Sequence, residues 1–368
     1  MKKAPLALAS ILIFTAAFGQ ETVTLPAKPS NPAAGRVLRL REVLRISDSG
    51  SAFFFKSPEN IQPAPDGGFL VVDENEFLTF DARGKFIVNM FRAGQGPGEF
   101  RRIDDYLIQG LRLLAFQANP MKCVSMDLDG EFLREVKPEA RVSRLLGRCG
   151  DRLLAAEESF PAFDKVRKPE GELLDIVWTL KLMNEEGRVE ATSLTFPIKW
   201  FAMRLGGAFI ADHVTFFHCV PLEDGLVAVA HEEGYAVKIA DPRRNAVVRT
   251  IRRDYRRVKY APEKDADPPG GARGLAFPLA HFNDIQKVYA VEGRIWAVTS
   301  TLEPAKGVLV DVISPRGEYL DNFYLPLPKG VSLPRLVRHP LTISGRTVLA
   351  LEYLETGELE VVKYEIVE

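Results

Sequence analysis

The chain has 368 residues, of which 46% are hydrophobic and 26% are charged. This length and composition allow a well-buried core in one large domain or in two. The 48 Lys and Arg residues nearly balance the 49 Asp and Glu residues, and the formal net charge is -1. The balance gives no global electrostatic reason to expect a nucleic acid or an anionic membrane as a partner.

The N-terminal residues 1–19 have the pattern of a secretory signal peptide. Lys2 and Lys3 precede an apolar run that extends to Phe18, and small residues flank a cleavage position after Gly19. The run is too short to span a bilayer comfortably, although an uncleaved anchor is the alternative. We therefore expect an exported protein, periplasmic or extracellular, with no transmembrane segment after cleavage.

Residues 20–36 follow the expected cleavage position and are rich in Pro, Ala and Thr. Segments of this composition at a chain end are usually poorly ordered unless another element holds them. We expect a flexible lead-in here, followed by one folded domain over residues 37–368.

One phrase then recurs six times along the chain. It consists of a strand, a tight turn that contains Gly, and a strand rich in β-branched and large apolar residues. Gly suits such turns because they require a positive φ, which costs other residues a steric penalty. The six turns are Asp66–Gly68, Gln109–Gly110, Gly150–Asp151, Asp224–Gly225, Glu292–Gly293 and Ser344–Gly345.

A second turn follows each of the first five phrases. Its Asp, Asn or Ser can bond to the nearby backbone, and its Gly, where present, takes the left-handed position. Four strands per unit predict an all-β fold, a six-bladed β-propeller. The five turns are Asp81–Gly84, Asp127–Gly130, Asn184–Gly187, Asp241–Asn245 and Ser314–Gly317.

The sixth unit lacks its second turn, because the chain ends with a third strand over residues 359–367. Residues 37–46, at the other end of the chain, can supply the missing fourth strand. We expect this N-terminal strand to complete the last blade, since closing the ring removes an exposed sheet edge.

Residues 91–100 carry a Gly-rich phrase that resembles the NHL repeat. The resemblance is good over residues 60–135 and implies an exported bacterial six-bladed propeller, which fixes a fold more than a function. The phrase is expected to be a compact crossover in which Phe100 packs between blades and Glu99 binds backbone N–H groups; a ligand-binding loop is the alternative. Its residues are Gly94, Gly96, Pro97, Gly98, Glu99 and Phe100.

The loops of a propeller divide between two faces. If the strands of each blade run outward from the axis, the crossovers between blades share one face with the turns between second and third strands. The long insertions, at 159–174, 196–209 and 252–282, all fall on this side, which we call the long-loop face. Variable loops on a rigid frame are where binding sites concentrate, so we expect the site on this face.

Polar residues at the ends of inner strands on the long-loop face are expected to ring a central channel. Converging carboxylates and imidazoles could bind a ligand, and Ca²⁺ or another divalent ion is one option, although no compact metal motif is present and no cofactor is predicted. Solvated rim residues or backbone caps are the alternative. The candidates are Asp73, Asp105, Glu157, Asp212, His213, His231 and Asp284.

Two further features were considered as sites. Arg252, Arg253, Arg256 and Arg257 could form an anion-binding patch for a glycan or a lipid head group, or a solvated strand protected by its charge. Cys149 and Cys219 are predicted to lie on neighbouring blades, near the face opposite the long-loop face. We expect two small buried thiols there, and a disulfide between them is the alternative.

These observations predict an exported, monomeric propeller that binds a ligand or a partner, such as a protein, peptide or glycan, through its long-loop face without catalysis. The sequence contains no nucleophile elbow, P-loop or Cys-pair zinc motif. Two alternatives stay open. One is a divalent-metal-dependent hydrolase or lyase with carboxylates at the channel, and the other is an assembly scaffold of the cell envelope.

Overall fold

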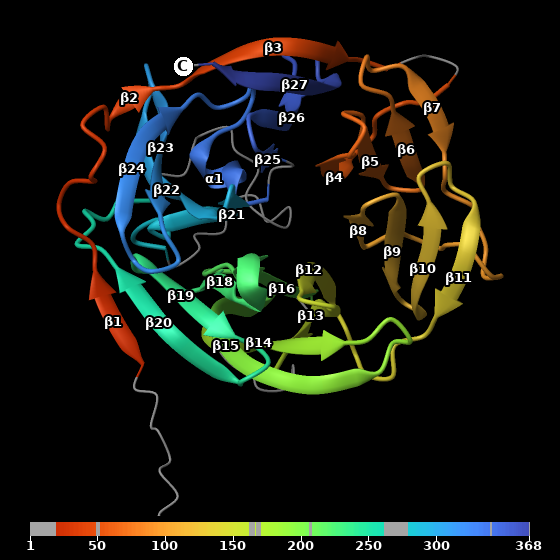
Figure 1. Cartoon of the computed structure of the whole chain (residues 1–368), viewed down its shortest axis with the longest axis horizontal. Coiled ribbons are helices and arrows are strands. Elements are labelled where there is room, and N and C mark those ends of the chain that lie inside the picture. Colours follow the sequence, from red (N-terminus) through yellow and green to blue (C-terminus); the bar gives the residue numbers. More distant parts are fainter. Residues whose placement is uncertain are drawn as a thin grey trace, which may run out of the picture.

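The computed structural model describes residues 20–48, 52–161, 166, 171–205, 208–260, 279–338 and 341–367. The signal peptide predicted at 1–19 lies outside them. The described strands form six sheets arranged as a ring around a central axis (Figure 1). The prediction of a six-bladed β-propeller is confirmed.

The strands of each blade follow one another in sequence from the axis outward, except that strands from the N-terminal part of the chain form the outer edges of the fourth, fifth and sixth blades. The first blade contains β4 (Pro58–Pro63), β5 (Phe69–Asp73), β6 (Glu76–Phe80) and β7 (Phe86–Asn89). The second contains β8 (Asp105–Gln109), β9 (Arg112–Ala118), β10 (Met121–Asp127) and β11 (Phe132–Val136). The third contains β12 (Arg144–Cys149), β13 (Arg152–Ser159), β14 (Glu172–Met183), β15 (Val189–Leu205) and β16 (Ala208–His213).

The other three blades contain the rest of the described strands. The fourth has β17 (His218–Pro221), β18 (Val227–Ala230), β19 (Ala236–Asp241) and β20 (Ala246–Arg252), and the fifth has β21 (Ile285–Val291), β22 (Arg294–Glu303), β23 (Gly307–Ile313) and β24 (Tyr319–Leu325). The sixth has β25 (Leu341–Ser344), β26 (Thr347–Tyr353), β27 (Leu359–Val367) and β3 (Arg39–Ile46). The short helix α1 (Leu333–Leu336) precedes β25.

All eleven predicted turns join neighbouring antiparallel strands of one blade. The turn between β17 and β18 shows why Gly is needed there, because Gly225 has a φ of +73° and Asp224 before it has +62°. These are left-handed conformations, which Gly adopts without the steric penalty of a Cβ atom.

The hydrophobic core consists of six layers, each between two neighbouring blades. Strand β18 shows how alternation produces them: Val227 and Val229 belong to a layer with Leu154 of the third blade, whereas Ala228 belongs to the next layer, with Ile295 of the fifth. Successive side chains of a strand point to opposite faces, so the middle strands are buried on both sides. Each blade therefore needs both neighbours to bury its apolar surface.

The ring closes in the sixth blade, where β3 from the N-terminal part of the chain lies beside the C-terminal strand β27 (Figure 1). Strand β3 pairs antiparallel with β27, from Ile46 opposite Val361 to Arg39 opposite Val367. The predicted closure by an N-terminal strand is correct, although the pairing begins at Arg39 rather than at residue 37.

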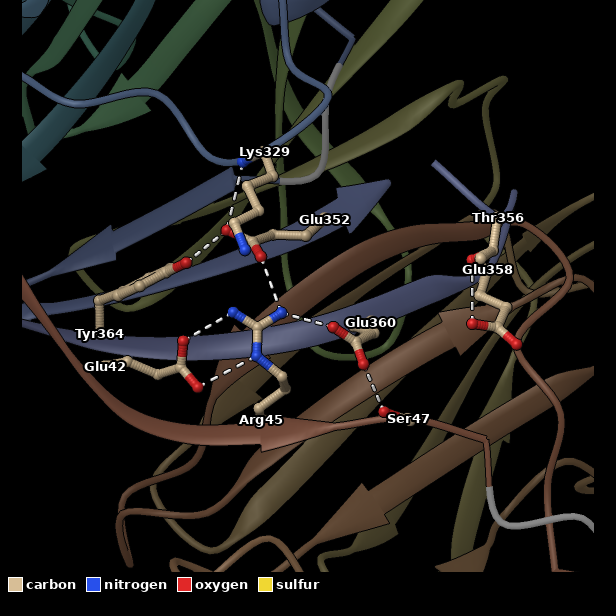
Figure 2. Close-up of polar contacts among 9 residues, drawn as sticks. All are labelled: Glu42, Arg45, Ser47, Lys329, Glu352, Thr356, Glu358, Glu360 and Tyr364. Carbon is tan, nitrogen blue, oxygen red and sulfur yellow. Dashed lines mark hydrogen bonds and ion pairs between the residues drawn. The ribbon is translucent and has the colours of Figure 1, made fainter. Parts of the chain in front are cut away.

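The side chain of Arg45 links three parts of this closure (Figure 2). Its guanidinium forms an ion pair with Glu352 of β26 at 2.8 Å and a second ion pair with Glu360 of β27. It also donates to Glu42 on its own strand at 2.6 and 3.0 Å. Glu352 is only 1% exposed and accepts a further hydrogen bond from the Tyr364 hydroxyl, so this is a connected and largely buried network.

Residues 20–36 are not the flexible lead-in that was expected. β1 (Glu21–Thr24) pairs in parallel with β20 on the outer edge of the fourth blade, and β2 (Arg36–Val37) pairs in parallel with β24 on the fifth. The N-terminal segment thus runs along the outer edges of the fourth, fifth and sixth blades, to which it contributes β1, β2 and β3 in turn. The outer edges of the fourth and fifth blades gain hydrogen-bonding partners in this way. These hydrogen bonds are the physical reason why residues 20–36 adopt a defined structure.

The insertion expected as a loop at 196–209 is largely strand. β14 and β15 extend beyond the inner part of the third blade as a long two-stranded ribbon, and β16 pairs back on β15. Alternating apolar residues of the ribbon, among them Trp178 and Ile198, are buried in the layer shared with the fourth blade. Burial of this face explains why the segment is ordered as sheet.

We predict that Arg45→Met lowers the free energy of unfolding by about 2 to 4 kcal/mol, because it leaves the buried Glu352 carboxylate without its cation. Arg41→Met is the matched control. Arg41 is also on β3 and pairs with Glu365 of β27, but its side chain is 65% exposed, so the expected cost is below about 1 kcal/mol. Urea unfolding of both variants provides the measurement, and equal losses would contradict the prediction.

Candidate functional site

The axis of the ring contains a cavity of about 630 Å³. All six inner strands contribute to its wall, and most of the lining residues lie near the beginnings of these strands. Inner strands begin on the side of the blade-to-blade crossovers, so the cavity belongs to the long-loop face. The cavity thus lies on the face where the site is predicted, and its use for binding stays a prediction.

Each inner strand places at least one polar side chain in the wall of this axial channel. Six of these, one from each blade, are two amide or hydroxyl groups, one acid, one imidazole and two cations. In blade order they are Asn60, Asp105, Arg144, His218, Lys287 and Thr342, and Glu59 of β4 also lines the wall.

Asp105 is the buried acid of the channel, with 6% of its surface exposed. Its carboxylate accepts hydrogen bonds from Asn60 at 3.2 Å and from the backbone N–H groups of Tyr106 and Leu145 at 2.9 and 3.1 Å. Burial raises the pKa of Asp105 to about 6, although the nearby charge of Arg144 acts in the opposite direction. Its charge therefore changes near neutral pH.

Two cations come from the third and fifth blades, and the first of them, Arg144, lies 4.0 Å from Asp105. Arg144 on β12 and Lys287 on β21 flank β17, which carries His218. Burial and the charge of Arg144 lower the pKa of Lys287 to about 7. Burial, with the charges of Lys287 and Arg144, lowers the pKa of His218 to about 3, so this imidazole is neutral at physiological pH.

Aromatic side chains form another part of the wall. The ring of Trp178, from the ribbon of the third blade, stacks on Phe217 with centroids 4.9 Å apart and an interplanar angle of 6°. Ile198 from the same ribbon and Val220 from β17 also line the cavity. The ribbon therefore gives the channel an apolar side beside its cations.

Paired charges also lie on the cavity wall, between the third and sixth blades. His213 Nε2 lies 2.8 Å from Glu158 Oε1. Arg338 pairs with Asp212 and lies over the ring of Phe216 at 5.6 Å. His213, Phe216 and Arg338 line the cavity, whereas Asp212 lies behind them.

Two of the seven predicted channel residues, Asp105 and His213, line the cavity. Of the others, Asp73 accepts backbone N–H bonds from Lys56 and Ser57, both at 2.7 Å, and so acts as the backbone cap that was the alternative. The remaining four are engaged in local pairs. Glu157 pairs with Lys181, Asp212 with Arg338, His231 with Lys238 and the Pro197 carbonyl, and Asp284 with Arg257.

The basic stretch does not form one anion-binding patch. Arg253 turns inward and pairs with Asp311, whose side chain is fully buried. Arg252 lies 3.3 Å from Glu232. Arg257 lies 3.4 Å from both Glu233 and Asp284, and Arg252, Arg256 and Arg257 are all exposed. Acidic partners on neighbouring elements therefore divide the charge.

Cys149 and Cys219 do not form the considered disulfide, since both are free thiols. The Cys149 Sγ lies 2.7 Å from the backbone oxygen of Gly225, to which it donates. Burial raises the pKa of the Cys219 thiol well above its usual range. Both behave as small buried side chains.

The Gly-rich crossover has the structural geometry that was expected. Phe100 is fully buried between the first two blades, and Glu99 accepts a hydrogen bond from the Gly96 N–H at 2.8 Å. Gly94 has a φ of +158°, and a Cβ atom there would clash with the Glu99 carboxylate. The motif thus holds its own loop and leaves the channel to other residues.

Within the described ranges, no group of three or more His, Cys, Asp or Glu residues lies together in a way that could hold a metal ion. No helix in the described part of the chain has the length and apolarity needed to cross a membrane.

Sequence reasoning missed Arg144, Lys287 and His218 as a set. The prediction rested on acids and imidazoles at strand ends. One signal was available, since a Lys such as Lys287 inside the short inner strand β21 is unusual in a buried strand and indicates a polar cavity.

Comparison with known proteins supports this architecture. Residues 51–153 match the model of the DUF5128 family, which is described as a six-bladed β-propeller. No curated protein matches the chain. A solved structure from Bacteroides fragilis NCTC 9343, described as an exported protein, has a TM-score of 0.53 and 11% identity, with coverage of 94% of this chain and 100% of that chain.

A member of the DUF4221 family from Bacteroides vulgatus ATCC 8482 has a TM-score of 0.50 and 12% identity, with coverage of 90% of this chain and 99% of that chain. At such identities the likeness shows the fold alone. The chain is thus a six-bladed β-propeller that is similar to structures from Bacteroides, one of them described as exported. The NHL-repeat identity stays a prediction.

We predict that Lys287→Met raises the stability of the protein at pH 6 to 7 by about 1 to 3 kcal/mol, because the folded state disfavours the charged amine. The folded pKa is below the unfolded value, so the unfolded chain binds more protons between about pH 7 and 10.5. Wild-type stability should therefore rise with pH in this window, and the advantage of the variant should shrink.

Melting curves from pH 6 to 10 provide the measurement. Lys85→Met, on the exposed turn between β6 and β7, is the control and should change little at any pH. A stability difference between wild type and Lys287→Met that does not depend on pH would contradict this account of Lys287.

Proposed function

We propose that this protein is an exported binding protein that holds a small ligand in its axial channel, entered from the long-loop face, without catalysing a reaction. The observation that carries the proposal is the cavity of about 630 Å³ to which every inner strand contributes. This volume lies within the range of small-molecule sites, roughly 300 to 1,000 Å³.

The composition of the wall supports a binding site. Apolar and aromatic side chains of the wall lie beside polar groups that approach from all six blades. Such an arrangement gives affinity through the apolar surface and orientation through the polar groups.

The reactive groups of the channel support binding over chemistry. Burial keeps the Cys219 thiol protonated, and a thiol is a weak nucleophile compared with a thiolate. The Ser143 hydroxyl accepts a hydrogen bond from the Glu158 N–H at 2.9 Å, and the ring of His213 is held by the Glu158 carboxylate. These groups are occupied in holding the wall together.

The two other functions raised by the sequence have weaker support. A metal-dependent hydrolase or lyase requires converging ligands, and the predicted carboxylates instead form separate local pairs in the described structure. An envelope scaffold would bind its partners through an outer surface, whereas the cavity that supports the present proposal lies on the axis.

We predict that the mature protein, purified from its native source, retains or binds a small molecule that a filled channel excludes. Val220→Trp and Leu146→Trp each place a large ring in the cavity and should weaken binding at least tenfold. Leu111→Trp is the control, since Leu111 is 76% exposed on the turn between β8 and β9, away from the channel.

Mass spectrometry of compounds released on denaturation identifies the ligand, and titration calorimetry measures its affinity. Melting temperatures show whether each variant is folded. The two Trp substitutions are on different strands, so the test can still be made if one of the two variants does not fold. If both folded variants bind the compound as well as wild type does, the ligand site lies elsewhere and the proposal is wrong.

A further inference from the structure

A long side chain crosses the mouth of the channel. Arg338 lies in the crossover between the fifth and sixth blades, and its guanidinium pairs with Asp212 near the end of β16, in the third blade. The fourth and fifth blades lie between these two positions in the ring, so the side chain passes over part of the axial opening. Arg338 also lines the cavity, and 47% of its side chain is exposed. One side of this residue therefore faces solvent and the other faces the channel.

The base of Arg338 is fixed by the core, whereas the end of its side chain is not. Two residues before it, Leu336 is fully buried in the layer between the fifth and sixth blades, and its N–H donates to the Ser332 carbonyl at 3.0 Å. The side chain extends from this anchor and lies over the ring of Phe216, 5.6 Å from its centroid. Rotation of one side chain, with no change in the backbone, is therefore enough to remove the bridge.

The acid that receives Arg338 offers it a single oxygen. Asp212 is 5% exposed, and the carboxylate oxygen that meets Arg338 also accepts the His213 N–H at 2.7 Å. The other oxygen, Oδ2, is buried and has no hydrogen-bond partner among the described residues. Ion pairs with a half-exposed partner are weak, and a cation over an aromatic ring adds a modest contribution. Such a bridge can open and close without disturbing the fold.

We propose that Arg338 is a gate of the channel: its bridge to Asp212 closes the mouth most of the time, and a ligand enters or leaves when the side chain rotates away. This inference rests on the proposed function, because it concerns access to the same site. When a gate opens and closes rapidly, the rate of entry is proportional to the fraction of time that it is open. Removal of the gate should therefore accelerate entry without any change in the channel wall below it.

Entry can be measured without a ligand, because the free thiol of Cys219 lines the cavity. The experiment follows alkylation of the mature protein by iodoacetamide, which is small and uncharged, and peptide mapping by mass spectrometry separates Cys219 from the other thiols. Arg338→Ala should raise the rate about fivefold or more, because the opening is then never bridged. Arg256→Ala removes an exposed cation from another crossover on the same face and should leave the rate unchanged.

A second variant keeps the test independent of folding. Arg338→Ala leaves the buried Asp212 carboxylate without its cation, which lowers stability. The double variant Arg338→Ala/Asp212→Asn removes that charge as well and should show the same increase in rate, and melting temperatures check both proteins. The pH profile of each rate should keep its shape, since burial and then the charge of Arg144, rather than Arg338, act on the pKa of the Cys219 thiol.

Salt and a filled channel give two further readings. Because the reagent is uncharged, salt acts through the bridge, so the wild-type rate should rise between about 0.02 and 0.5 M NaCl and the Arg338→Ala rate should not. Leu146→Trp should cancel the gain of Arg338→Ala, because the thiol is reached along the axis. A folded Arg338→Ala variant with the wild-type rate, or a gain that survives Leu146→Trp, would overturn the inference. The ligand binding measured by calorimetry is separate from these rates, so the proposed function would stand.

Discussion

The structure depends on one constraint, which is that the apolar surface of every blade is buried only between two neighbours. Each of the six core layers draws residues from two blades, so a ring with one open junction would expose two faces of apolar surface. The pairing of β3 with β27 closes that junction, and the Arg45 network fixes the strand in place (Figure 2). The N-terminal segment adds β1 and β2 to two other blades, so one stretch of chain joins half of the ring.

The same constraint produces the channel. Six sheets packed face to face around an axis bring six inner strands together around that axis. The first residues of these strands line a cavity on the axis and do not fill it. Side chains that line this space can be polar, because it is accessible from the long-loop face and need not satisfy the packing rules of the layers. The ribbon of the third blade then narrows the opening with Trp178 and Ile198, which gives the channel an apolar side that a symmetric ring would lack.

Much of the fold could be predicted because its signals are local. Turns such as Asp224–Gly225 require left-handed backbone, and the missing strand of the sixth unit followed from counting strands. The pairing of β1 with β20 and of β2 with β24 could not be predicted. A strand that adds in parallel to an outer edge is placed by tertiary structure, and segments of four and two residues are too short to show a periodic pattern. Site residues were harder still: Asp73 and Asp105 have similar sequence surroundings at strand ends, yet one caps backbone N–H groups and the other faces the channel.

The charged groups of the channel depend on one another across neighbouring blades. Burial and the nearby charge of Arg144 both lower the pKa of Lys287, so the folded state disfavours the charged amine. Arg144 itself lies 4.0 Å from Asp105, the buried acid of the adjacent blade, and its charge opposes the effect of burial on the pKa of that acid. The acid and the amine are thus coupled through Arg144, and the apolar side formed by the Trp178 and Phe217 rings lies on the same cavity wall.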